Sequence, residues 1–141
     1  YTPTDSANVP TGTLAAVEGT ALELRKPTEL GRRLRDAAFN GGRGYDHNYA
    51  LDGGEAAAEL WCPATGIGLT MSTTMEGMQL YTAGWLTERG GKGGAVYGAF
   101  HGVCLETQHF PNAVNCPSFP SPLLRAGETL HQRTAFRFFT R

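Results

Sequence analysis

A glutamate in the middle of a predicted strand is the first candidate for chemistry in this chain. Glu106 lies in the run Cys104-Leu-Glu-Thr-Gln108, which leads into a loop rich in proline and asparagine. Alternate residues of a strand share a face, so Cys104, Glu106 and Gln108 point to the same side. That side is suited to polar contacts, and a carboxylate held there can act as a general base.

Two more polar residues, Asp46 and Gln79, lie on predicted strands upstream. Asp46 shares a strand face with Asn48, and Gln79 shares one with Tyr81. Carboxylates and amides suit a polyhydroxylated ligand because each hydroxyl both donates and accepts hydrogen bonds, while an aromatic ring covers apolar C–H surface. From the residues alone, a turn-stabilising role after the preceding glycine is the favoured explanation of Asp46. The polar face of an edge strand is an equally ordinary explanation of Gln79.

Three motifs in order resemble the galactose mutarotase (aldose 1-epimerase) family. They are Gly44-Tyr-Asp-His-Asn-Tyr-Ala-Leu51, Gly77-Met-Gln-Leu-Tyr-Thr82 and Cys104-Leu-Glu-Thr-Gln108. The order and spacing agree along nearly the whole chain, from Pro10-Thr-Gly12 to Gly127-Glu128. Because the family's members are longer, residues 1–141 are expected to be the C-terminal portion of a single mutarotase-like domain whose N-terminal portion is missing.

The resemblance implies a cofactor-independent enzyme that interconverts the α and β anomers of a free hexose such as galactose or glucose. Glu106 would remove the proton from the anomeric hydroxyl, while Asp46 and Gln79 would bind sugar hydroxyls. A histidine would protonate the ring oxygen; the ring would open, the C1–C2 bond rotate and the ring close to the other anomer. In the family this histidine lies upstream of the position of Tyr1.

None of the chain's own histidines matches the family's acid. His47 and His109 fall on the strand faces turned away from the candidate site residues, His101 precedes a glycine at a strand start, and His131 lies in the last predicted strand. We interpret all four as structural or surface residues. The chain by itself is therefore expected to be inactive.

Three explanations of such a chain stay open. The first is the enzyme without its N-terminal portion. The second is a non-catalytic sugar-binding or sensing module that keeps Asp46, Gln79 and Glu106, and the third is a subunit that completes its fold against another chain.

A related family acts on hexose 6-phosphates and would need a cationic pocket for the phosphate. Arg43 is the only cationic residue near the three motifs, which disfavours such a substrate. The run Ala83-Gly84-Trp85 departs from the family's usual Gly-Asn-aromatic order, which bears on sugar preference.

Short strands separated by turn residues predict an all-β chain, an antiparallel β-sandwich, and the resemblance implies the same fold with a sugar cleft across one sheet. The predicted strands are Tyr45–Leu51, Ala56–Cys62, Ile67–Thr73, Met78–Ala83, Val103–Gln108 and Thr129–Phe139. A hairpin is expected over residues 13–25 and a short helix over 29–38. Ile67, Leu69 and Met71 are expected to face a core.

Composition excludes several classes of function. With 12 basic and 13 acidic residues among 141, the chain lacks the charge excess of a nucleic-acid-binding protein. It has no apolar run long enough for a membrane span, no spacing typical of a metal site and no phosphate loop in Gly90-Gly-Lys-Gly-Gly94. The three cysteines are expected to be free, mostly buried thiols of a cytoplasmic protein, although family members also occur in the periplasm. Because the chain begins at Tyr1 rather than methionine, we expect a processed or truncated start.

Overall fold

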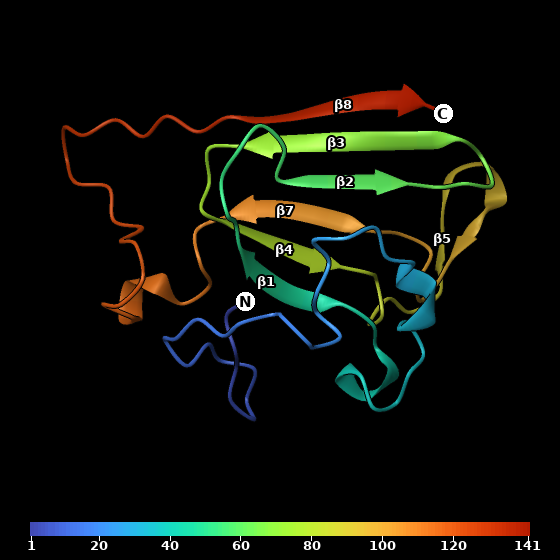
Figure 1. Cartoon of the computed structure of the whole chain (residues 1–141), viewed down its shortest axis with the longest axis horizontal. Helices are drawn as coiled ribbons and strands as arrows, with labels where there is room; N and C mark the ends of the chain where they lie inside the picture. The colour runs from blue at the N-terminus through green and yellow to red at the C-terminus, as the bar shows by residue number, and fades with distance from the viewer.

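The computed structural model describes all residues from 1 to 141, with antiparallel strands joined by turns and long loops (Figure 1). The first sheet has the order β1–β4–β7, formed by Asp46–Ala50, Gly77–Tyr81 and Cys104–Gln108. The second has the order β2–β3–β8, formed by Ala58–Trp61, Ile67–Thr73 and Thr134–Thr140. A ribbon pairs β5 (Arg89–Gly90) with β6 (Val96–Tyr97). The only helices are short 3-10 turns at Leu30–Arg32, Asn40–Gly42, Lys92–Gly94 and Ala113–Asn115.

The predicted antiparallel β architecture is confirmed, since every strand pairing in the three sheets is antiparallel. The strand Ile67–Thr73 has the predicted bounds, and most of the other predicted strands differ by one or two residues at an end. The last strand begins only at Thr134, where it first pairs with Thr73. The β5–β6 ribbon was not predicted; it brackets the glycine-rich run Gly90-Gly-Lys-Gly-Gly94. No helix has the length and apolar character needed to cross a bilayer.

The predicted hairpin over residues 13–25 is wrong, because the segment forms turns and no strand. The hydroxyl of Thr20 donates to the carbonyl of Val17 at 2.6 Å and accepts from the backbone N–H of Leu22 at 3.1 Å. Such local side-chain bonds compete with strand pairing for the backbone groups. Val17 and Leu22 still contribute to the core, although from turns rather than from strands.

The predicted helix over residues 29–38 is also wrong. Only Leu30–Arg32 is helical, and the segment continues as successive turns in which Asp36 N–H bonds to Arg33 and Phe39 N–H bonds to Asp36. A helix this short is marginal without strong packing, so the tighter turns prevail. The predicted apolar spacing is nevertheless used, because Leu30 and Leu34 both pack against the core.

The back of the first sheet carries the main core. Leu80 and Tyr45 are 4% and 0% exposed and pack with Val17, Leu22 and Phe39. Much of the segment 17–39 thus packs against this sheet, in the blue and cyan part of the chain in Figure 1. Burying each large apolar side chain contributes roughly 1.5–3 kcal/mol.

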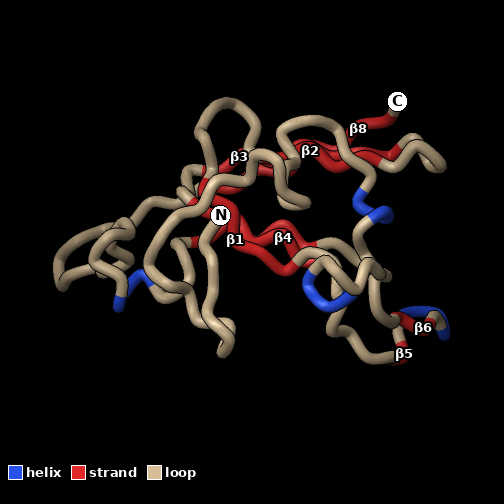
Figure 2. Tube along the Cα trace, turned by 60° about the horizontal axis from the view of Figure 1, so that its bottom comes forward, coloured by secondary structure: helices blue, strands red, loops and turns tan.

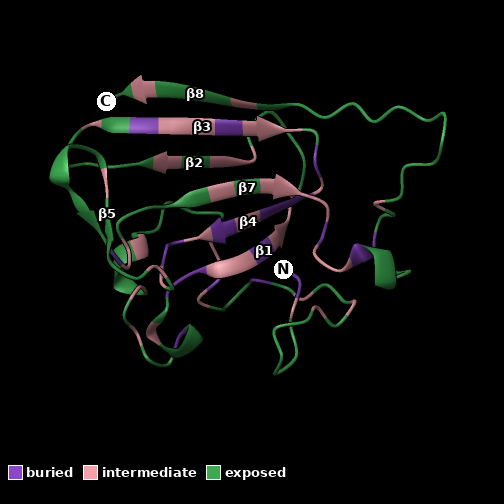
Figure 3. Cartoon of the chain, turned by 180° about the vertical axis from the view of Figure 1, so that it is seen from behind, coloured by how far each residue is buried: buried purple, intermediate pink, exposed green.

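The second sheet is far more open. Figure 3 shows β4 largely buried and β8 largely exposed. Met71 is fully buried as predicted, but Ile67 on the same face is 57% exposed and Phe138 is 71% exposed. Thr107 and Thr134 hydroxyls lie 2.7 Å apart and link β7 to β8. Figure 2 shows the two sheets as separate layers. The exposure of Ile67 and Phe138 leaves part of the apolar face of the second sheet uncovered.

Truncating a core side chain tests this arrangement. We expect Leu80→Ala to lower the free energy of unfolding by about 2–4 kcal/mol, because it leaves a cavity beside Tyr45. The matched variant Leu123→Ala, at a position 63% exposed, should change it by less than about 0.5 kcal/mol. Urea denaturation of the purified proteins measures both. Equal effects of the two substitutions would contradict a core at Leu80.

Candidate functional site

The three residues singled out from the sequence lie on one face of the β1–β4–β7 sheet. Asn48 lies opposite Gln79, which lies opposite Glu106, and Asp46 lies opposite Tyr81 in the neighbouring row. Directly opposed residues of antiparallel strands share a face. We call this the polar face; it comprises Asp46, Asn48, Ala50, Gly77, Gln79, Tyr81, Cys104, Glu106 and Gln108. The structure therefore brings Asp46, Gln79 and Glu106 together, as the strand alternation predicts.

Asp46 and Gln79 are joined directly. Nε2 of Gln79 donates to Oδ1 of Asp46 at 2.8 Å, between strands β4 and β1. Both residues are half-buried. The bond fixes the orientation of both groups, so they present a preformed pair of polar atoms rather than two mobile side chains.

Glu106 differs from Asp46 in its surroundings. It is exposed and forms no hydrogen bond or ion pair within the chain. Partial desolvation, together with the nearby Glu106 carboxylate, raises the pKa of the Cys104 thiol, which is otherwise exposed on the same strand. The raised pKa disfavours the thiolate and so argues against a nucleophilic thiol. Both carboxylate oxygens of Glu106 are free of hydrogen bonds within the chain.

One end of the polar face is closed by a small apolar cluster. Phe110, Ala113, Cys116 and Phe119 are buried together and pack against Ala50. The rings of Phe110 and Phe119 meet edge to face at 5.1 Å between centroids. These residues form a wall beside the row that contains Gly77 and Gln108.

The opposite end carries an aromatic residue. The backbone N–H of Trp85 donates to the hydroxyl of Tyr81 at 3.2 Å, and the guanidinium carbon of Arg43 lies 3.5 Å from the centroid of the Trp85 ring. Gly84 permits this approach, because a Cβ there would clash with the carbonyl oxygen of Arg43. The run Ala83-Gly84-Trp85, which departs from the family's usual order, therefore places the indole of Trp85 next to the row formed by Asp46 and Tyr81.

Asn48 and Gln108 are joined on the polar face by a side-chain contact that the sequence does not reveal. Asn48 is only 3% exposed, and its Oδ1 accepts a hydrogen bond from Nε2 of Gln108 at 3.1 Å. Strand alternation places each on the polar face, but their contact joins β1 to β7 across β4. Only knowledge of the strand order could have revealed it.

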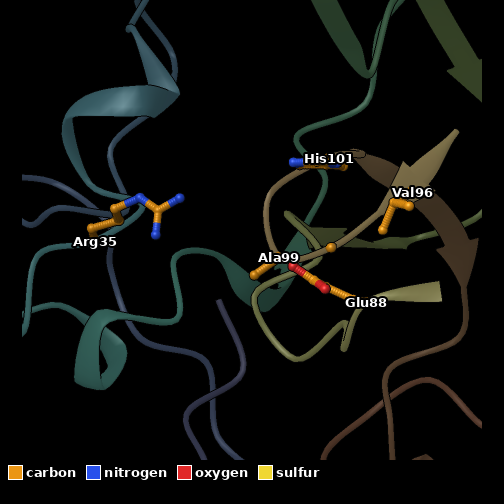
Figure 4. A pocket seen from close by; sticks show the side chains of 6 residues that line it. Arg35, Glu88, Val96, Ala99 and His101 are labelled. Carbon is orange, nitrogen blue, oxygen red and sulfur yellow. The ribbon is translucent and has the colours of Figure 1, made fainter.

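The histidines lie away from the polar face. His47 stacks on Phe39 behind the sheet, and Nδ1 of His109 lies 2.7 Å from a carboxylate oxygen of Glu76. His131 is exposed in a loop. His101 lines a cavity of about 450 Å³ with Arg35 and Glu88, and no residue of the polar face lines it (Figure 4).

The cysteines and the other potential metal ligands form no site of their own. All three cysteines are free, but the expectation of mostly buried thiols is wrong: Cys62 and Cys104 are exposed and only Cys116 is buried. Cys104 is exposed because its side chain belongs to the polar face rather than to the core. No three His, Cys, Asp or Glu side chains lie close enough together to hold a metal ion.

Comparison with known proteins gives one consistent result. Residues 1–137 match the family model described as aldose 1-epimerase. The chain is 46% identical to human galactose mutarotase and 30% identical to aldose 1-epimerase of Escherichia coli, in each case over 98% of this chain. It spans 41% and 42% of the lengths of these two relatives. A solved aldose epimerase homologue from C. elegans superposes with a TM-score of 0.85 at 22% identity, covering 99% of this chain and 42% of that one.

Acid sensitivity of the fold should depend on His47. Burial lowers the pKa of His47, against a smaller opposing effect of Asp46. The folded state therefore holds this imidazole neutral while the unfolded chain binds a proton more readily, and stability is lost as the pH falls below about 6.5, the ordinary pKa of histidine. We expect His47→Gln to flatten the decline in unfolding free energy between about pH 7 and pH 5. His131→Gln, at an exposed position, should leave the decline as it is.

Proposed function

The chain belongs to the aldose 1-epimerase family, and from this premise we propose that it supplies the base and part of the sugar-binding surface of an enzyme that interconverts the anomers of a free hexose. The observation that carries the proposal is the unpaired carboxylate of Glu106 beside the Asp46–Gln79 pair on one sheet face. The names of the relatives, galactose mutarotase and aldose 1-epimerase, support galactose or another free aldose as the substrate.

In the proposed reaction Glu106 removes the proton of the anomeric hydroxyl. The O1–H electron pair forms the carbonyl at C1, the bond from C1 to the ring oxygen breaks, and the ring oxygen takes a proton from an acid. Rotation about C1–C2 turns the other carbonyl face toward the ring oxygen, and the reverse steps close the ring as the other anomer. A positioned base contributes typically about 10²–10⁴ in rate.

Glu106 fits the role of base better than Asp46 does. One oxygen of Asp46 already accepts a hydrogen bond from Gln79, so this carboxylate is committed to a fixed polar pair. Glu106 accepts none and is exposed, so its carboxylate is accessible to a ligand on the polar face. We assign Asp46 and Gln79 to binding of sugar hydroxyls, and we assign the acid to a residue outside this chain.

We further propose that residues 1–141 are the C-terminal portion of one larger mutarotase-like domain. The curated relatives are more than twice as long as the matched region. The uncovered side of the β2–β3–β8 sheet supports this, since Ile67, Phe136 and Phe138 are 57%, 48% and 71% exposed. Apolar side chains gathered on one sheet face indicate a surface that another segment buries.

A non-catalytic sugar-binding module is the second candidate. Its support is that the Asp46–Gln79 pair is preformed while all four histidines lie off the polar face. The two candidates share the binding surface and differ in the need for Glu106 as a base.

Replacing the base separates these candidates. In a full-length form of the protein, Glu106→Gln should keep galactose binding within a few fold but reduce anomer interconversion by about 10²-fold or more, because it preserves size while removing the base. Polarimetry of freshly dissolved α-galactose measures the rate. Glu55→Gln, in an exposed loop, is the matched control and should be unaffected. A Glu106→Gln rate close to wild type would exclude the catalytic role.

Residues 1–141 expressed alone should be inactive and should self-associate. The exposed apolar face of the second sheet favours association, and unpaired strand edges favour aggregation. Adding the preceding portion of a full-length chain as a separate polypeptide should reduce this self-association, because residues 1–141 would bind that portion instead. The same addition should restore some mutarotation. Sizing and polarimetry with and without that portion decide the matter, and a monomeric, fully active chain 1–141 would contradict the proposal.

A further inference from the structure

Two side-chain amides on the polar face donate in the same direction, toward strand β1. Gln108 donates from Nε2 to Oδ1 of Asn48 at 3.1 Å, and Gln79 donates from Nε2 to Oδ1 of Asp46 at 2.8 Å. The acceptors, Asn48 and Asp46, are two residues apart on that strand. The two bonds are therefore neighbouring parts of one array rather than unrelated contacts.

Gly77 makes the longer of these contacts possible. In the register it lies between Ala50 and Gln108, directly under the path from β7 to β1. A Cβ at this position would lie 3.0 Å from Oδ1 of Asn48 and 2.9 Å from the ring of Phe110. The absence of a side chain on β4 at this one position thus lets an amide on β7 reach an amide on β1.

Two amide groups on the polar face make no hydrogen bond at one of their polar atoms, and they belong to residues that are directly opposed in the register. Nδ2 of Asn48 is buried and has no hydrogen-bond partner. Gln79 uses its Nε2 for Asp46, and its Oε1 accepts no hydrogen bond. Asn48 and Gln79 are directly opposed, which places their Cβ atoms about 4.5–5.5 Å apart. A buried donor left unpaired is rare in proteins and costs about 1–3 kcal/mol.

We propose that Asn48 is a positioning residue that acts through Gln79: in the sugar-bound state Nδ2 of Asn48 donates to Oε1 of Gln79 and completes a relay Gln108→Asn48→Gln79→Asp46. This inference rests on the sugar-binding role assigned to Gln79 and Asp46 above. The relay links the strand that carries Glu106 to the pair that binds the sugar. It also occupies the carbonyl oxygen of Gln79, so this amide meets the sugar with its remaining N–H.

A relay of this kind strengthens each of its members, because each amide that accepts a hydrogen bond becomes a better donor to the next. Loss of Asn48 should therefore weaken sugar binding without touching the base. The expected signature is a change in affinity that depends on the presence of Gln79, together with an interconversion rate at saturating sugar that stays within about threefold of wild type.

A double-mutant cycle tests the relay. In the full-length protein, Asn48→Ala should raise the galactose Kd measured by calorimetry about three- to tenfold, the value of one hydrogen bond. Asn48→Ala combined with Gln79→Ala should bind within about twofold of Gln79→Ala alone, because the effect of Asn48 passes through Gln79. Asn48→Asp keeps the acceptor for Gln108 but sets an acceptor against Oε1 of Gln79, so it should weaken binding at least as much as Asn48→Ala.

Tyr49→Phe is the matched control. The Tyr49 hydroxyl is the other buried polar group without a partner, on the same strand but on the opposite face of the sheet. Its removal should leave the galactose Kd unchanged. Urea denaturation of each variant separates loss of fold from loss of binding.

The outcomes separate the relay from the function on which it rests. Independent, multiplicative effects of Asn48→Ala and Gln79→Ala on Kd, or an Asn48→Asp protein that binds like wild type, would overturn the relay alone. A wild-type protein that binds galactose without interconverting its anomers would refute the enzymatic proposal, and the cycle would still decide the relay from Kd. A wild-type protein that binds no hexose would overturn both.

Discussion

The pairing register of β1, β4 and β7 is the constraint on which the site depends. Side chains alternate with a period of two, so a slip of one residue would turn Glu106 toward the core and Leu105 toward solvent. The register places Asn48, Gln79 and Glu106 in one row and Leu80 and Leu105 together on the other side. The buried cluster behind the sheet, around Tyr45 and Leu80, therefore determines which atoms are presented in front.

Much of this sheet could be predicted from the sequence, because one face of each strand is polar and the other apolar. The alternation around Glu106, Asp46 and Gln79 was sufficient to place all three on a common side. The secondary structure of residues 13–25 and 29–38 was predicted wrongly because it was inferred from the apolar pattern alone. Their apolar spacing is real and is used in packing, but short segments at the edge of a core are shaped by local turn bonds, such as those of Thr20, which hydrophobic patterns do not encode.

The contacts that refine the site could not be predicted, because each depends on which strands are neighbours. The sequence gives no reason for a glycine at position 77. Once β4 is known to lie between β1 and β7, the reason is clear: the missing side chain leaves room for Gln108 to reach Asn48. Likewise, Trp85 and Arg43 are 42 positions apart in number and meet only because β1 and β4 pair. Asn48 illustrates the difference most clearly: the sequence predicts its face, and only the structure shows it buried with an unpaired donor.

The polar face also explains why the proposed reaction needs a group from elsewhere. It bears two carboxylates, Asp46 and Glu106, and no histidine or lysine. A base alone could remove the anomeric proton, but the ring oxygen would then have to leave as an alkoxide, which is costly unless a proton or a positive charge meets it. Arg43 lies at the rim stacked on Trp85, and the nearest histidines are behind the sheet or beside it. We therefore infer that, in the proposed reaction, the acid approaches from the open side of the polar face, opposite the strands that carry the proposed base. This inference follows from the charge of the polar face itself, and it is independent of the apolar surface on the second sheet, which separately supports the proposal of a larger domain.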